Sequence, residues 1–120
     1  MRIKGVRAQA VDLRRAGENK PVDRREKASS SKPKRLPPQP AARHPAPWLK
    51  AMCLVDTEDG TFGCGMTIAS GPVCSIINDH LADIVVGESA MATEKIYDLL
   101  IRATASYGNS GVTSHAIAAV

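Results

Sequence analysis

Residues that could carry catalytic or metal chemistry are few in this sequence and stand far apart. His44, His80 and His115 are separated by 36 and 35 positions, and none pairs with a cysteine or carboxylate at metal-ligand spacing. We therefore predict no metal site. His80 lies beside the apolar face of a predicted helix, so we interpret it as a partly buried, hydrogen-bonded histidine.

The three cysteines, Cys53, Cys64 and Cys74, form an odd set without a Cys-x-x-Cys pair. No apolar signal segment precedes them, so the sequence favours a reducing, cytoplasmic setting. All three fall in predicted strands or helices whose faces should be buried. We therefore interpret them as small core residues and not as reactive thiols.

Two further motifs fail to complete an active site. The segment from Gly60 to Gly65 satisfies neither glycine-rich phosphate-binding pattern, and no lysine follows it. Ser70 precedes Gly71 but lacks the glycine pattern of a nucleophile elbow, and no base is positioned by the sequence to activate it. The expected role of Ser70 is to cap a helix, so the chain alone is predicted not to be an enzyme.

Charge is divided sharply along the chain. Residues 1–50 carry fourteen Lys and Arg against four Asp and Glu, whereas residues 51–120 carry two against eight. The basic segment is either a solvated tail or a contact for an acidic partner. It contains no interleaved aromatic residues, so we predict no specific nucleic-acid binding. No apolar run is long enough for a membrane span, and we predict no membrane partner.

The N-terminal half predicts a strand, a loop and a hairpin. Near alternation indicates a first strand over residues 1–13, and residues 14–47, with seven of the eight prolines, predict a disordered basic loop. Asp59-Gly60 predicts a type I′ turn between two strands that start near Trp48 and Thr61. In the second of these, bulky residues share one face and glycines leave the other open to a close backbone approach.

Three helices are predicted from apolar periodicity. The first starts at Ser70-Gly71-Pro72 and ends before Gly87, the second runs from Ser89 to Gly108, and the third begins near Gly111. The predicted fold class is α+β: a three-stranded antiparallel meander packed on a three-helix bundle, with its core in residues 48–120. The third helix reaches Val120 without a stop signal, from which we expect further residues to follow.

An ordered series of short motifs carries a family resemblance. The motifs are Asp56-Thr-Glu-Asp-Gly-Thr-Phe-Gly-Cys-Gly65, His80-Leu-Ala82, Val86-Gly-Glu88, Glu94-Lys-Ile-Tyr-Asp98, Tyr107-Gly108 and His115-Ala-Ile-Ala-Ala-Val120. Residues 48–120 thus resemble the N-terminal capping domain of the enolase superfamily, in the branch of mandelate racemase and muconate lactonising enzyme. Within that branch the resemblance is to acid-sugar dehydratases of the rhamnonate dehydratase type.

The resemblance implies a domain that covers the mouth of a (β/α)₈ barrel, which would follow Val120 and is absent from this sequence. In the family the barrel supplies the Mg²⁺ ligands and the base, so the resemblance implies no catalytic residue, metal ligand or cofactor in this chain. The capping domain supplies two loops that exclude water and select an acid-sugar substrate.

The two loops map onto residues 14–47 and the segment from Thr67 to Pro72. The resemblance implies that Arg43 and His44 in the first loop, with Thr67 and Ser70 in the second, contact the substrate. The leading hypothesis is an N-terminal fragment of a Mg²⁺-dependent sugar-acid dehydratase, inactive alone. The alternative is a non-catalytic protein-binding module that uses the barrel-facing surface or the basic arm.

Self-association is expected in either case. The barrel-facing residues would have no cover within the chain, and we expect this exposed apolar surface to drive association or loose packing. The residues expected on it are Ile68, Val112, Ile117 and Val120.

Overall fold

A computed structural model describes residues 1–13 and 49–120. The strands are β1 (Ile3–Asp12), β2 (Leu49–Thr57) and β3 (Phe62–Thr67), and the helices are α1 (Ser70–Ile76), η2 (Ile77–Leu81), α2 (Ala82–Val85), α3 (Thr93–Ala103) and α4 (Val112–Ala119). The sheet is antiparallel with the order β1-β2-β3, so the predicted α+β meander is confirmed. The predicted disordered loop lies outside the described residues.

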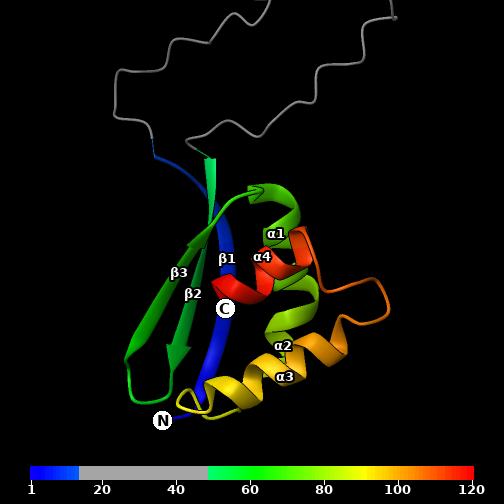
Figure 1. Cartoon of the computed structure of the whole chain (residues 1–120). Helices are drawn as coiled ribbons and strands as arrows, with labels where there is room; N and C mark the ends of the chain where they lie inside the picture. The colour runs from blue at the N-terminus through cyan, green and yellow to red at the C-terminus, as the bar shows by residue number, and fades with distance from the viewer. Residues whose placement is uncertain (14–48) are drawn as a thin grey trace, which may run out of the picture. The chain divides into compact units, whose positions relative to one another are not determined.

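The helices cover one face of the sheet (Figure 1). Side chains that are at most 1% exposed join the two layers: Ala51 and Cys53 from β2, Val73, Ile77, Leu81 and Val85 from the first helical run, Leu100 from α3 and Ala116 from α4. The core therefore lies between β2 and the helical run α1-η2-α2. Within the described residues, no helix is long and apolar enough to cross a membrane.

The first predicted helix forms over its whole expected length but contains a π turn. In η2 the amide of Ala82 donates to the carbonyl of Ile77, an i→i+5 bond that widens the turn. This widening lets buried residues recur every fourth position, at Val73, Ile77, Leu81 and Val85. The predicted cap is wrong: Ala69, in a left-handed conformation with φ 57°, precedes the helix, and Ser70 is its first residue.

The hairpin is confirmed, but its turn is not type I′. A type I′ turn requires positive φ at both central residues, and between β2 and β3 only Gly60 has it, with φ 87°. Instead, Gly60 donates to the carbonyl of Thr57 at 3.2 Å while Thr57 donates to the carbonyl of Thr61 at 3.0 Å. This pattern is a turn closed by a glycine bulge, which adds one residue to the β3 side.

The second helix is shorter than predicted. It begins at Thr93, because residues 87–89 lie along β1 instead: Ile3 donates to the carbonyl of Glu88 at 2.9 Å and accepts from Gly87 at 2.8 Å. The helix ends at Ala103, so Tyr107, expected on its buried stripe, is 50% exposed.

The cysteines do not share one environment. Cys53 is fully buried, Cys74 is half-buried, and Cys64 is exposed. The prediction that all three are core residues is therefore wrong for Cys64, which lies on the sheet face away from the helices. On the opposite face of β3, the predicted close backbone approach occurs at Gly65, where a Cβ would lie 2.0 Å from the carbonyl oxygen of Ala119, and not at Gly63, where a Cβ would meet nothing within 4 Å.

Candidate functional site

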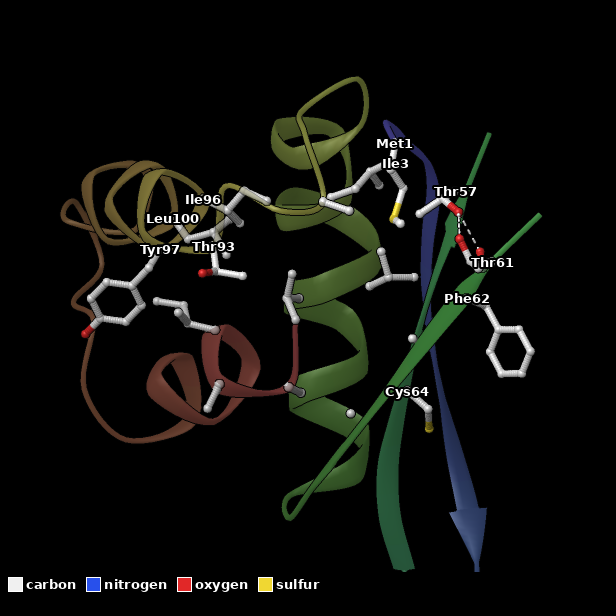
Figure 2. Close-up of a pocket in the computed structure, with 18 of the residues that line it drawn as sticks. Met1, Ile3, Thr57, Thr61, Phe62, Cys64, Thr93, Ile96, Tyr97 and Leu100 are labelled. Carbon is white, nitrogen blue, oxygen red and sulfur yellow. Dashed lines mark hydrogen bonds between the residues drawn. The ribbon is translucent and has the colours of Figure 1, made fainter. Parts of the chain in front are cut away.

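An apolar cleft of about 930 Å³ opens between the hairpin and α3. Figure 2 shows Ile96 and Leu100 of α3 on one side, with Met1, Ile3 and the hairpin on the other. Its apolar lining comes from the chain start, β2, α3 and α4, namely Met1, Ile3, Val55, Ile96, Leu100, Ile117 and Val120. Glu94 is the only charged residue among the described residues that line it.

The walls of the cleft are continuous with the core. Ile3, Leu100 and Ile117 are 4%, 1% and 6% exposed, so they contact the core as well as the cleft. The prediction that Ile117 lies uncovered is therefore wrong, and Val120 is half-buried against the same core. Ile68 and Val112 are 45% and 38% exposed, as expected. The cleft can accept apolar side chains but offers little polar recognition.

A small polar network forms the hairpin end of the cleft. Thr57 Oγ1 donates to Asp59 Oδ1 at 2.5 Å, Thr61 N donates to the same oxygen at 3.1 Å, and the Thr61 hydroxyl also bonds to it. Hydrogen bonds from the Thr57 side chain, then from Thr61, lower the pKa of Asp59 to about 2. An acceptor held ionised in this way stabilises the turn and is a poor proton donor near neutral pH.

The predicted substrate contacts are only partly described. Arg43 and His44 lie outside the described residues. Thr67 is half-buried, and its Oγ1 lies 3.4 Å from Nδ1 of His115. Ser70 is half-buried at the start of α1, and neither Thr67 nor Ser70 lines the cleft. Sequence reasoning missed the approach of His115, because no spacing rule connects residues 48 positions apart.

The register places the residues that flank the two candidate loops at one end of the sheet. Asp12, at the end of β1, pairs with Leu49 at the start of β2. Two residues further along β2, Ala51 pairs with Thr67 at the end of β3. The segment between β1 and β2 therefore leaves the sheet and re-enters it at the same end at which β3 finishes. The loop after β3 starts at the same end. This arrangement brings the ends of both loops together, whereas the cleft lies towards the hairpin end.

The other described histidine matches its interpretation. His80 is half-buried, and its Nδ1 lies 2.6 Å from the hydroxyl of Tyr107, with the ring centroids 5.6 Å apart. Residues 1–13 and 49–120 contain no group of three or more His, Cys, Asp or Glu side chains that could hold a metal ion. The described residues therefore do not fit a Mg²⁺ site.

No protein-family model matches this chain. Among curated proteins, the chain is 46% identical over 66 residues to an L-rhamnonate dehydratase from Saccharopolyspora erythraea. That match covers 55% of this chain but 17% of the relative, so the chain corresponds to a small part of the curated enzyme.

Solved structures show the same fold over nearly all of this chain. A member of the enolase superfamily from Agrobacterium tumefaciens aligns with a TM-score of 0.65 and 25% identity, covering 98% of this chain and 31% of that one. A mandelate racemase/muconate lactonizing protein from Paracoccus denitrificans, complexed with magnesium, aligns with a TM-score of 0.66 and 16% identity, covering 98% and 24%. In both sequence and fold, this chain is therefore similar to a part of enolase-superfamily proteins.

Proposed function

We propose that this chain is the capping domain of a Mg²⁺-dependent acid-sugar dehydratase of the rhamnonate type, without catalytic activity of its own. The observation that carries the proposal is the 46% identity to an L-rhamnonate dehydratase. The described residues offer no metal cluster, so the metal and the proton-transferring base would have to come from a barrel domain.

The shape of the domain supports a covering role. The apolar cleft is a surface suited to contact with further protein, since burying an aliphatic side chain there contributes about 1.5–3 kcal/mol. The two loops at the opposite end of the sheet would border the substrate. A capping domain needs both features: a face that docks and loops that exclude water.

The substrate contacts in this proposal are Arg43, His44, Thr67 and Ser70. An arginine suits the carboxylate of a sugar acid, because its guanidinium can donate two parallel hydrogen bonds. Hydroxyl side chains suit the sugar hydroxyls, since they both donate and accept. Thr67 and Ser70 support this role only by their positions at the end of β3 and the start of α1, near the sheet end formed by Asp12 and Leu49.

Activity assays on a chimera test the proposal. The barrel of the Saccharopolyspora erythraea enzyme would be joined after Val120, in place of that enzyme's own N-terminal segment. We expect the chimera to dehydrate L-rhamnonate with Mg²⁺ and the chain alone to give only the buffer rate. A folded chimera without turnover, or turnover by the chain alone, would contradict the proposal.

The alternative function is a non-catalytic protein-binding module in a reducing, cytoplasmic setting. The apolar cleft is the observation that favours it, because the same face could bind a separate protein. The chimera distinguishes the two functions: restored dehydration requires a capping role, whereas a pure binding module would leave the joined barrel inactive.

A further inference from the structure

Within residues 1–13 and 49–120, β3 pairs only with β2, and its other edge offers backbone groups in a regular pattern. Thr57 donates to the carbonyl of Thr61, so these two residues form a hydrogen-bonded pair. In an antiparallel ladder every second pair is hydrogen-bonded, so the backbone groups of Gly63 and Gly65 point towards β2. The amides and carbonyls of Phe62, Cys64 and Met66 therefore point to the open edge. β3 contains neither proline nor a charged residue, the usual devices that prevent edge pairing.

The opposite edge of the sheet, along β1, is covered at Ala8 and Ile3. Asn78, on η2, uses its side-chain amide like a neighbouring strand: Oδ1 accepts from Ala8 N at 2.7 Å, and Nδ2 donates to Ala8 O at 2.8 Å. Further along β1, Ile3 exchanges backbone bonds with Gly87 and Glu88. Within the described residues the sheet thus has one protected edge and one open edge.

The open strand is complementary to itself. Its sequence Phe62-Gly-Cys-Gly-Met66 reads similarly in both directions about Cys64, with a bulky apolar residue at each end. A two-fold axis at Cys64 would set Cys64 against Cys64 and Phe62 against Met66 of the second copy. The backbone groups of all three residues point to the open edge, so every pair in this register would exchange backbone hydrogen bonds between the two copies.

The side chains fit the same arrangement. Phe62 is 72% exposed and Met66 56% exposed, and Figure 2 shows the Phe62 ring turned away from the helices. We propose that a second copy of this chain pairs antiparallel through β3 about Cys64, forming a continuous six-stranded sheet. Phe62 would then cover Met66 of the other copy, an aromatic–sulfur contact. Because Asn78 and residues 87–89 close the β1 edge, the assembly stops at a dimer.

Thiol cross-linking tests the register directly. In the full chain with Cys74→Ser, a short bis-maleimide should join Cys64 to Cys64 in high yield at concentrations at which the chain is dimeric, since the two thiols then face each other. The matched control carries Gln9→Cys with Cys64→Ser and Cys74→Ser, which places an exposed thiol on β1, two strands from the open edge. Equal yields from the two proteins, or none at Cys64, would overturn the proposal.

Sedimentation equilibrium tests the interface without a reagent. Cys64→Lys sets two like charges directly opposite each other and should weaken the dimer at least about tenfold. Gln9→Lys adds the same charge to the chain away from that edge and should leave the dimer unchanged. Circular dichroism would check that both variants fold. Equal dimerisation of the two variants, or a monomeric wild type, would contradict β3 pairing, and should Cys64→Lys not fold, the cross-linking result decides.

Discussion

Cys53, Cys64 and Cys74 share one side-chain chemistry but differ in environment. Burial of Cys53 is the main cause that raises its pKa to about 11, with smaller contributions from the charges of Cys64 and Cys74. Burial also raises the pKa of Cys74. Cys64 stands exposed on the outer face of β3. Because the thiolate is the reacting form, these environments set an order of reactivity.

We predict that a maleimide labels Cys64 first, Cys74 more slowly and Cys53 last at pH 8. A pKa near 11 in place of 9 lowers the thiolate fraction of Cys53 about hundredfold, and burial blocks access as well. Mass spectrometry of timed, quenched samples measures the order, with protein unfolded in urea as the control in which the three should react alike. Early labelling of Cys53 in the folded chain would contradict the packing of β2.

Asp59 gives the hairpin a defined pH dependence. Its folded pKa of about 2 lies below the ordinary aspartate value of 3.8, so its contribution to stability is fully present above about pH 4 and is lost as pH falls through about 2. We predict that Asp59→Asn is less stable than wild type at pH 5 and that this difference shrinks towards pH 2. Urea unfolding measures the difference, and an NMR titration midpoint for Asp59 near 3.8 or above would contradict the network.

At the scale of elements, Gly65 and Gly63 lie on the same strand face but have different surroundings. A Cβ at Gly65 would meet the backbone of Ala119, whereas one at Gly63 would meet nothing within 4 Å. We predict that Gly65→Ala destabilises the fold by about 1–3 kcal/mol, because α4 must move. Gly63→Ala should be neutral or stabilising by about 0.5–1 kcal/mol, since strand glycines lose more entropy on folding. Chemical denaturation of both variants measures the contrast, and equal effects would refute this docking of α4.

Asn78 connects the π turn to the sheet. We predict that Asn78→Leu destabilises the fold by roughly 1–3 kcal/mol, because Ala8 loses both partners of its backbone groups. Ser75→Ala, on the same helical run, removes only an exposed bond to Asp79 and should change stability by less than about 0.5 kcal/mol. Amide exchange at Ala8 should accelerate in Asn78→Leu alone. Unchanged exchange there would show that the contact does not protect the β1 edge.

At the scale of the whole molecule, the cleft dominates the behaviour of the isolated chain. An apolar opening of about 930 Å³ whose walls are continuous with the core should bind a hydrophobic dye. We predict that Ala118→Lys, at an exposed position lining the cleft, reduces dye fluorescence several-fold. Ala105→Lys, exposed but away from the lining, should not. Equal fluorescence from both variants would place the dye elsewhere.

The sequence by itself determined the element types and the α+β class, and it carried the resemblance to the enolase superfamily. Strand alternation, the glycines of the hairpin and the apolar spacing of the helices are local signals, because neighbouring residues impose them. One error was local, because the Asp59-Gly60 turn gained a bulge. The other had a distant cause: α3 starts four residues later than Ser89 predicted, because residues 87–89 lie along β1. For the cleft, the sequence offered Ile117 and Val120 as part of an apolar surface, but it did not bring them together with the chain start and α3.

Only the tertiary structure decided which groups meet. Thr67 approaches His115, Asn78 closes the edge at Ala8, and Cys64 faces outward while Cys53 is buried. Each outcome depends on how distant segments pack, and chain separation carries no information about it. The cleft has the same origin, since it exists only because the hairpin, the chain start, α3 and α4 surround one space. Packing among distant segments, and not local propensity, therefore creates the cleft and brings Thr67 to His115.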